Sequence, residues 1–330
     1  MSDTFKALVL NQQDGQTVSE IRTLGNDDLP PGDVLLAVEY SSLNYKDGLA
    51  ITGRGKIIRE WPLVPGIDLA GRVLESHHHD YAKGDGVILT GWGVGEKYWG
   101  GYSQRQRVQG KWLVPMPAGM DSFRAMAIGT AGFTAMLCVM ALEDAGVHTD
   151  AGTVLVTGAS GGVGSIAVAI LHHLGYRVAA VSGKPEASDY LHELGARQIL
   201  SRDEMSAPPR ALEGQRWAAA IDTVGGTMLA RVLAETNYGG CVAACGLAGG
   251  ADLPTTVMPF ILRIVSLRGV DSVSCPFDRR MLAWQRLVKD LPAAALGEIG
   301  QVASLEQLPA LADRITRGQI RGRIIVDPNL

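Results

Sequence analysis

Hydrophobic residues in the first third of the chain stand in short runs that turn-forming residues interrupt. Examples are residues 7–10, 34–38 and 87–89, with turn sequences such as Pro30-Pro31-Gly32-Asp33 between them. Short apolar runs bounded by Gly and Pro predict β-strands joined by tight turns. We therefore expect residues 1–123 to form a compact, mostly β domain.

The pattern changes near Ser122, where predicted strands and helices begin to alternate. Helices are predicted at 163–174 and 184–194. Strands are predicted at 154–156, 178–181, 198–200, 218–222 and 240–244. Apolar strands that alternate with helices indicate a parallel, doubly wound sheet with helices on both faces. We assign residues 124–296 to this second domain, which makes the chain an α/β protein.

The last part of the chain returns to a β pattern. Residues 320–326 form a short apolar run after a helical segment. We expect the segment 297–330 to rejoin the first domain, so that the domain is built from both ends of the chain.

Residues 125–142 carry no charge and are numerous enough to span a lipid bilayer. Small and polar residues, including Gly129-Thr130, interrupt this stretch, and Glu143-Asp144 end it. We therefore interpret the stretch as a buried helix with a Gly-Thr start.

Composition narrows the classes of protein to which the chain can belong. Of its 330 residues, 46% are hydrophobic and 19% are charged, which suits a packed core and excludes a disordered chain. The formal net charge of -4 provides no basic excess for binding nucleic acid. Residues 1–10 do not form a secretory signal, and the four cysteines show no paired C-x-x-C spacing. We expect a soluble, cytoplasmic protein without a nucleic-acid or membrane partner.

A Gly-rich turn after the first strand of the second domain predicts a dinucleotide site. Ala159-Ser160-Gly161-Gly162-Val163-Gly164 follows a strand and opens a helix. It matches the G-x-G-x-x-G fingerprint, with Ala in place of the first Gly. Gly161 lets the backbone approach a pyrophosphate, and the helix N-terminus offers N–H groups to the phosphates. We expect Ser160, Gly161, Gly162 and Val163 to bind the pyrophosphate.

The end of the next strand indicates which dinucleotide is bound. An NAD site needs a carboxylate there to hold the ribose hydroxyls. This chain has Ser182-Gly183-Lys184 instead, and Arg202 follows the third strand. A hydroxyl and two cations favour the 2′-phosphate of NADPH, although these cations also fit an ordinary solvated surface.

The first domain lacks the usual ligands of a catalytic zinc ion. Such a site needs three protein ligands, usually Cys, His or Glu. Residues 1–123 contain no cysteine, and their only histidines are His77-His78-His79. Because adjacent side chains point apart on most backbones, we interpret these histidines as part of a solvated loop, and we expect no bound metal.

Several further segments form a recognisable set. They are Ser42 to Asp47, Pro65 to Asp68, Gly129 to Ala135 and the Gly-rich turn. This set resembles the zinc-free, quinone oxidoreductase-like branch of the medium-chain dehydrogenase/reductases. Within that branch the chain is similar to the NADPH-dependent acryloyl-CoA reductases. The segments that carry this closer match are Ile51 to Gly53, Lys56 to Arg59, Leu89 to Glu96, Ala220 to Gly225, Cys241 to Leu247 and Pro259 to Arg263.

The resemblance implies a GroES-like first domain, a Rossmann second domain, NADPH in the cleft between them, and a homodimer. It implies that the 2′-phosphoadenosine end of NADPH is held by Ser182, Gly183, Lys184 and Arg202. It also implies that Tyr45 contacts the cofactor near the nicotinamide, whose side is lined by Leu247, Ile261 and Ser272. The family usually has Asn where this chain has Gly318, so we expect no side-chain contact there.

The activity that the resemblance implies is reduction of acryloyl-CoA to propionyl-CoA, an oxidoreductase reaction on a CH–CH bond. Hydride from NADPH would add to the β-carbon of the thioester, and the charge that develops on its oxygen would need donors. An NADPH:quinone or enal/enone reductase would share the cofactor residues and remains an alternative. A non-catalytic NADPH-binding protein is a second alternative, although it would not need Asn44-Tyr45.

The implied activity suggests candidate residues for catalysis and for binding the substrate. Tyr45 is a candidate proton donor or relay, and Arg323 a candidate electrophilic neighbour of the thioester. Both residues also fit plain packing and structural roles. Arg54, Lys56 and Arg59 cluster in a Gly-rich loop and are candidates for binding the phosphates of CoA, or else form a solvated charge run.

Overall fold

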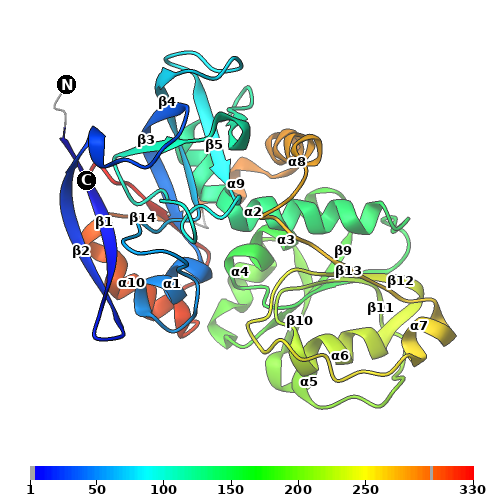
Figure 1. The fold of residues 1–330 in the computed structure, drawn as a ribbon. Helices are drawn as coiled ribbons and strands as arrows, with labels where there is room; N and C mark the ends of the chain where they lie inside the picture. Colours follow the sequence, from blue (N-terminus) through cyan, green and yellow to red (C-terminus); the bar gives the residue numbers. More distant parts are fainter. Residues whose placement is uncertain (1–3, 298–299) are drawn as a thin grey trace. The chain divides into compact units, whose positions relative to one another are not determined.

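The computed structural model of the protein describes residues 4–297 and 300–330, which divide into two compact units. The first unit contains the described residues of 1–130, 272–281 and 298–330, and the second those of 131–271 and 282–297. In Figure 1 the first unit joins the blue start of the chain to its red end.

The predicted division of the chain differs from these units at residues 124–130 and 272–281, which belong to the first unit, and at residue 297, which belongs to the second. Sequence reasoning left the two longer segments inside the second domain. Positions 298–299, within the predicted return of 297–330, lie outside the described residues.

The first unit is built on a largely antiparallel sheet. Its order is β14 (Gly300–Ala303), β15 (Arg323–Val326), β3 (Val34–Leu43), β4 (Asp68–Ser76), β5 (Gly86–Thr90) and β7 (Val114–Pro115), with β6 (Arg105–Val108) also paired to β3. A separate hairpin consists of β1 (Thr4–Gln13) and β2 (Gln16–Gly25). Strand β15 pairs with β3, where Ile325 lies opposite Ser42. The tail therefore returns to the first unit, as the β pattern at 320–326 predicts.

Two helices of the first unit pack against each other (Figure 1). Helix α1 (Tyr45–Thr52) follows β3, and α10 (Leu308–Thr316) precedes β15. A Cβ on Gly48 of α1 would overlap the side chain of Ile315, so glycine permits this close packing. Three short 3-10 turns complete the unit: Asn26–Asp28, Gly110–Trp112 and Leu305–Gln307.

The second unit contains a six-stranded sheet in which every strand is parallel to its neighbours. Its order is β10 (Ala196–Ser201), β9 (Arg177–Ser182), β8 (Thr153–Val156), β11 (Trp217–Asp222), β12 (Thr236–Ala244) and β13 (Ser266–Gly269). The chain order reverses between β8 and β11, and ligands of such folds bind at the carboxyl ends of the strands near this point. The predicted doubly wound Rossmann sheet is thus confirmed.

Helices connect these strands. They are α3 (Gly162–His173), α4 (Ser188–Glu193), α5 (Arg202–Ser206), α6 (Gly226–Glu235) and α7 (Met258–Arg263), while α9 (Ala293–Gly297) follows the last strand of this sheet. The predicted helix over 184–194 is shorter in the structure, because a 3-10 turn at Pro185–Ala187 precedes α4.

Two longer helices, α2 (Ser122–Glu143) and α8 (Phe277–Asp290), each contribute residues to both units. Helix α2 is interrupted at Gly129, where φ is 53° and ψ is -161°. It is long and apolar enough to cross a membrane, but 89% of its apolar window is buried inside the protein. Its burial is that of a core helix, as the sequence predicts.

Candidate functional site

The Gly-rich turn joins the carboxyl end of β8 to the start of α3. Gly158 in this turn has a φ of 59°, a left-handed conformation that favours glycine. A Cβ on Gly164, in the first turn of α3, would overlap the carbonyl oxygen of Gly158. The missing side chain therefore lets the helix approach the turn closely, which is the role of the last glycine of the fingerprint.

Ser160 to Val163 occupy the end of this turn and the start of α3, with Gly161 as the N-cap. The first N–H groups of a helix have no partner within the helix and favour an anion at its N-terminus. The structure thus brings the four predicted pyrophosphate residues together at a place that suits a phosphate.

Asp222, at the carboxyl end of β11, supports the base of the turn and was missed by sequence reasoning. Its buried carboxylate accepts a hydrogen bond from the Thr157 hydroxyl at 2.7 Å and another from the Gly225 N–H at 2.7 Å. Burial raises the pKa of Asp222 above its ordinary value. The Thr157 hydroxyl in turn accepts from the Thr223 N–H at 3.0 Å, so the ends of β8 and β11 are tied together.

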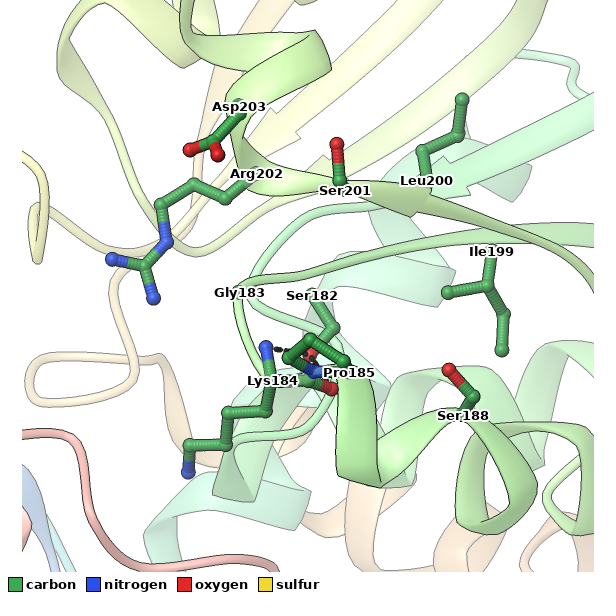
Figure 2. A pocket seen from close by; sticks show the side chains of 10 residues that line it. All are labelled: Ser182, Gly183, Lys184, Pro185, Ser188, Ile199, Leu200, Ser201, Arg202 and Asp203. Atoms are coloured by element: carbon green, nitrogen blue, oxygen red, sulfur yellow. Dashed lines mark hydrogen bonds between the residues drawn. The ribbon is translucent and has the colours of Figure 1, made fainter.

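A pocket of about 470 Å³ lies at the carboxyl ends of β9 and β10 (Figure 2). Its lining residues are Ser182, Gly183, Lys184, Pro185, Ser188, Ile199, Leu200, Ser201, Arg202 and Asp203. The pocket therefore contains all four residues that we predicted to hold the 2′-phosphoadenosine end of the cofactor. It also contains one carboxylate, that of Asp203.

Hydrogen bonds and packing hold these four residues in place. The Ser182 hydroxyl lies 3.1 Å from the Ser160 hydroxyl, which connects the pocket to the Gly-rich turn, and accepts from the Lys184 N–H at 3.1 Å. The Arg202 guanidinium packs on Gly183, where an added Cβ would overlap it. Figure 2 shows the Lys184 and Arg202 side chains extending toward the same side of the strand ends. Two cations and a hydroxyl in one pocket can bind a phosphate monoester.

Leu247 and Ser272 lie in different units of the structure. Leu247 follows the carboxyl end of β12, and it is 67% exposed. The Gly-rich turn lies at the same edge of the sheet. Ser272 belongs to the first unit, where its carbonyl oxygen accepts a hydrogen bond from Arg280 at 3.1 Å.

Ile261 is not brought to the other predicted cofactor residues. It lies in α7, where the Arg263 guanidinium donates to the carbonyl oxygen of Ala234 at 2.8 Å, two residues before β12 begins. This is the amino edge of the sheet, whereas the Gly-rich turn lies at the carboxyl edge. Ile261 is 69% exposed, and its expected contact with the nicotinamide stays a prediction.

Tyr45 begins α1 in the first unit, and its side chain is 44% exposed. The preceding residue, Asn44, is the N-cap of the helix and is buried. The following residue, Lys46, forms an ion pair with Glu96 at 2.8 Å. Tyr45 is therefore an accessible phenol on a helix start whose neighbours are fixed.

Asp47 holds the start of α1 from inside the unit. Its carboxylate accepts hydrogen bonds from the N–H groups of Asn44, Gly66 and Ile67 at 3.0, 3.2 and 3.0 Å. Burial, together with the nearby charge of Asp68, raises the pKa of Asp47 to about 7. The side chain thus binds a proton more tightly than an exposed Asp does.

We expect Asp47→Asn to stabilise the folded protein relative to the wild type increasingly as pH rises. Because the pKa of Asp47 is raised from 3.8 to about 7, the wild type loses stability as pH rises through this interval. Urea unfolding at about pH 5 and about pH 8 should show the difference growing by about 1 kcal/mol or more. A difference independent of pH would contradict the raised pKa.

Asp68 is the centre of a buried polar cluster beneath α1. Its carboxylate accepts hydrogen bonds from the Ser42 N–H at 3.0 Å and the Ser42 hydroxyl at 2.7 Å. It also accepts from the Asn44 side-chain amide at 2.9 Å and from the Thr130 N–H at 2.8 Å. Residues far apart in the sequence are thereby joined around one carboxylate.

Arg323 of β15 completes this cluster. Its guanidinium donates to the Asn44 side-chain oxygen at 3.1 Å, to the Ser42 hydroxyl at 2.6 Å and to the Ala127 carbonyl at 3.2 Å. Only 3% of the residue is exposed, and this burial lowers the pKa of Arg323. These contacts give Arg323 a structural role, and its expected role as an electrophilic neighbour of the substrate stays a prediction. Arg323 positions Asn44, the residue before Tyr45.

The three predicted CoA-binding cations have different surroundings. Arg54 forms an ion pair with Asp313 and a hydrogen bond to Thr316, both at 2.5 Å, so α10 already holds its guanidinium. Lys56 and Arg59 are exposed. All three cations are exposed, and Arg54 already has a carboxylate partner.

The histidine loop after β4 differs from its expected geometry. The rings of His78 and His79 stack with centroids 4.5 Å apart, whereas we expected adjacent side chains to point apart. One ligand atom from each ring and one from Asp80 lie within 4.8 Å of one another. The three residues are a candidate cation-binding group on the surface.

Comparisons with known proteins agree with this architecture. Residues 30–118 match the alcohol dehydrogenase GroES-like domain, and residues 162–289 match the zinc-binding dehydrogenase domain. The probable acrylyl-CoA reductase AcuI of Escherichia coli is 60% identical, over 98% of this chain and all of its own. Acrylyl-CoA reductase AcuI of Ruegeria pomeroyi is 55% identical, over 98% of this chain and 99% of its own.

Solved structures of related proteins also match this chain over nearly its whole length. Escherichia coli YhdH with bound NADPH has a TM-score of 0.96 and 59% identity, over 98% of this chain and 100% of its own. Bacillus subtilis YhfP with bound NAD has a TM-score of 0.96 and 46% identity, over 99% and 100% of the two chains. The chain belongs to the medium-chain dehydrogenase/reductase family, in the quinone oxidoreductase-like branch that includes the acryloyl-CoA reductases.

Proposed function

We propose that this chain reduces acryloyl-CoA to propionyl-CoA with NADPH. The observation that carries the proposal is its full-length similarity to the two acrylyl-CoA reductases. A phosphate-binding turn and a second anion-binding pocket at the carboxyl edge of the sheet support the cofactor part independently.

NADPH is the cofactor that the pocket beyond β9 suits. Ser182 stands at the end of β9, where NAD sites place a carboxylate. Lys184 and Arg202 then supply positive charge for the 2′-phosphate. Related structures carry either NADPH or NAD, so the selectivity of this chain rests on its own side chains.

When bound, NADPH supplies the hydride that the β-carbon of the unsaturated thioester accepts. The thioester oxygen then gains negative charge and needs hydrogen-bond donors. The hydroxyl of Tyr45, a residue that is 44% exposed, is our candidate for donating to that oxygen or for relaying a proton to the α-carbon. Asn44 and Asp47 fix the backbone on which Tyr45 stands. Packing of Tyr45 on the cofactor is the alternative role.

Lys56 and Arg59 are our candidates for binding the phosphates of CoA. We expect the double variant Lys56→Glu/Arg59→Glu to raise KM for acryloyl-CoA by about tenfold, because it replaces attraction to phosphate by repulsion. KM for NADPH should stay unchanged in steady-state assays.

A phosphate-free acceptor and a matched variant control this test. The acryloyl thioester of N-acetylcysteamine lacks the CoA phosphates, so its KM should not respond to the double variant. Lys83→Glu/Lys111→Glu makes the same change of charge at two other exposed positions of the first unit. Equal effects of both double variants would contradict a phosphate site at Lys56 and Arg59.

An NADPH-oxidation assay with acryloyl-CoA, crotonyl-CoA and a simple quinone tests the proposed function. We expect the highest kcat/KM with acryloyl-CoA and propionyl-CoA as the product in mass spectrometry. A quinone or an enal as the best acceptor would support the alternative reductase instead. Binding of NADPH without turnover of any acceptor would indicate a non-catalytic NADPH-binding protein.

We also propose that the protein acts as a homodimer. Strand β13 is an edge strand of the described six-stranded sheet. The segment before it exposes five apolar residues, which are 39–69% exposed: Val257, Met258, Ile261, Leu262 and Ile264. An edge strand beside exposed apolar side chains favours pairing with a second copy of the chain.

Three remaining proposals rest on the sequence. We propose a zinc-independent reaction, because residues 1–123 contain no cysteine for a catalytic zinc site. We propose a cytoplasmic location, which four free cysteines support. We also retain the proposed domains, 1–123 with 297–330 and 124–296.

A further inference from the structure

The turn from Gly91 to Glu96 in the first unit has an unusual backbone. Gly91, Trp92, Gly93 and Gly95 all have positive φ angles. Trp92 has a φ of 58°, and a bulky side chain in this left-handed region costs free energy. Such a conformation persists only where surrounding contacts hold it, and it often marks a functional site.

Arg280 of α8 supplies those contacts. Its fully buried guanidinium donates from Nη1 to the Thr90 carbonyl at 2.7 Å and to the Thr90 hydroxyl at 2.8 Å. From Nη2 it donates to the carbonyl oxygens of Ser272 and Val273 at 3.1 and 3.2 Å. The guanidinium carbon also lies 5.0 Å from the centre of the Trp92 ring, a distance at which a cation attracts an aromatic face.

The turn also binds the 272–273 segment directly. The Trp92 N–H donates to the Val273 carbonyl at 3.0 Å. A Cβ on Gly91 would lie only 2.7 Å from the Val273 carbonyl oxygen, so glycine permits the contact. Arg280 therefore fixes two segments whose backbones already touch.

The far end of the turn reaches the proposed substrate residues. Glu96 forms the ion pair with Lys46, the residue after Tyr45, at 2.8 Å. Its carbonyl oxygen accepts a hydrogen bond from the Arg59 N–H at 2.9 Å. One turn thus connects Ser272, a predicted neighbour of the nicotinamide, with the segments that carry Tyr45 and Arg59.

We propose that Arg280 is a positioning residue of the reductase reaction. It holds the strained turn so that Tyr45, Arg59 and Ser272 keep one relative placement during catalysis. The inference rests on the proposed function, because it assigns a role within that reaction.

Arg280→Met and Arg280→Lys test the proposal in the full-length protein. We expect Arg280→Met to lower kcat by about tenfold or more and to raise KM for the acceptor by about fivefold, because misplaced groups lose transition-state contacts. The Kd for NADPH, measured by fluorescence, should stay within about twofold of the wild type, since the phosphate sites belong to the second unit. Arg280→Lys, which keeps the charge, should be intermediate.

Arg286→Met is the matched control, because Arg286 lies in the same helix and is held by Glu143 and Asp290. Comparable losses of kcat/KM in both Met variants would overturn the proposal, as would wild-type kinetics of Arg280→Met. Should Arg280→Met fail to fold, Trp92→Leu removes the ring below the guanidinium, and wild-type kinetics there would also overturn the proposal.

The assays use whichever acceptor the wild type reduces best. A wild type that reduces no acceptor would overturn the proposed function and this role together. A wild type that reduces a quinone only, with Arg280→Met impaired as described, would overturn the proposed substrate and support the role of Arg280.

Discussion

Replacing both Lys184 and Arg202 by Ala is expected to raise the Kd for NADPH by about 100-fold and to leave the Kd for NADH within about threefold. The expected result is a loss of selectivity between the two cofactors, not a loss of dinucleotide binding. Isothermal titration with both cofactors measures it.

The physical reason lies in the pocket beyond β9. The two cations line one pocket and extend toward the same side of the strand ends. A charge-assisted hydrogen bond to phosphate contributes about 1–2 kcal/mol at a partly exposed position, so two such bonds together account for about two powers of ten. NADH lacks the 2′-phosphate, and its pyrophosphate would still bind at the N-terminus of α3.

A matched control separates this effect from a general change in charge. Arg177 and Arg197 are exposed cations at the amino ends of β9 and β10, the same two strands. Arg177→Ala/Arg197→Ala removes the same charge at the opposite edge of the sheet and should leave both Kd values unchanged. Equal losses of NADPH and NADH affinity in Lys184→Ala/Arg202→Ala would place the two cations elsewhere on the dinucleotide.

Gly129→Ala is expected to destabilise the protein by roughly 3–5 kcal/mol and to abolish most activity. Gly129 combines a φ of 53° with a ψ of -161°, a backbone conformation that is essentially restricted to glycine. A Cβ there would also overlap the Arg323 guanidinium and lie 2.6 Å from the Ser42 hydroxyl and 2.9 Å from the Asp68 carboxylate. The substitution would therefore displace the buried cluster that holds Asn44.

Gly119→Ala separates backbone strain from this overlap. Gly119 also has a positive φ, 81°, but a Cβ there would meet no atom within 4 Å. We expect a loss of only about 1 kcal/mol in urea unfolding and unchanged activity. If Gly129→Ala cost no more than Gly119→Ala, the close packing over the Asp68 cluster would be refuted.

The cofactor side of the protein was largely predictable from the sequence because its determinants are local. The Gly-rich turn lies between a strand and the helix that it opens, and Ser182 to Lys184 directly follow the next strand. Burial of the uncharged stretch at 125–142 was equally predictable, because one helix contains it. In each case the residues that interact are also neighbours along the chain.

The buried cluster was not predictable in this way, because it depends on contacts between distant residues. Asp68 accepts a hydrogen bond from Thr130, and Arg323 reaches back to Asn44. The ion pair between Arg54 and Asp313 on α10 is a further contact between distant residues.

The division of the first unit between the two ends of the chain has a consequence for synthesis on the ribosome. The second unit is complete once residue 297 has been made, whereas the first still lacks β14 and β15. Strand β15 lies inside the sheet, between β14 and β3, and carries Arg323. Although domains near the N-terminus usually fold first, here the nascent chain completes its N-terminal sheet last. Until β15 has been made, Asn44, the residue before Tyr45, lacks its hydrogen bond from Arg323.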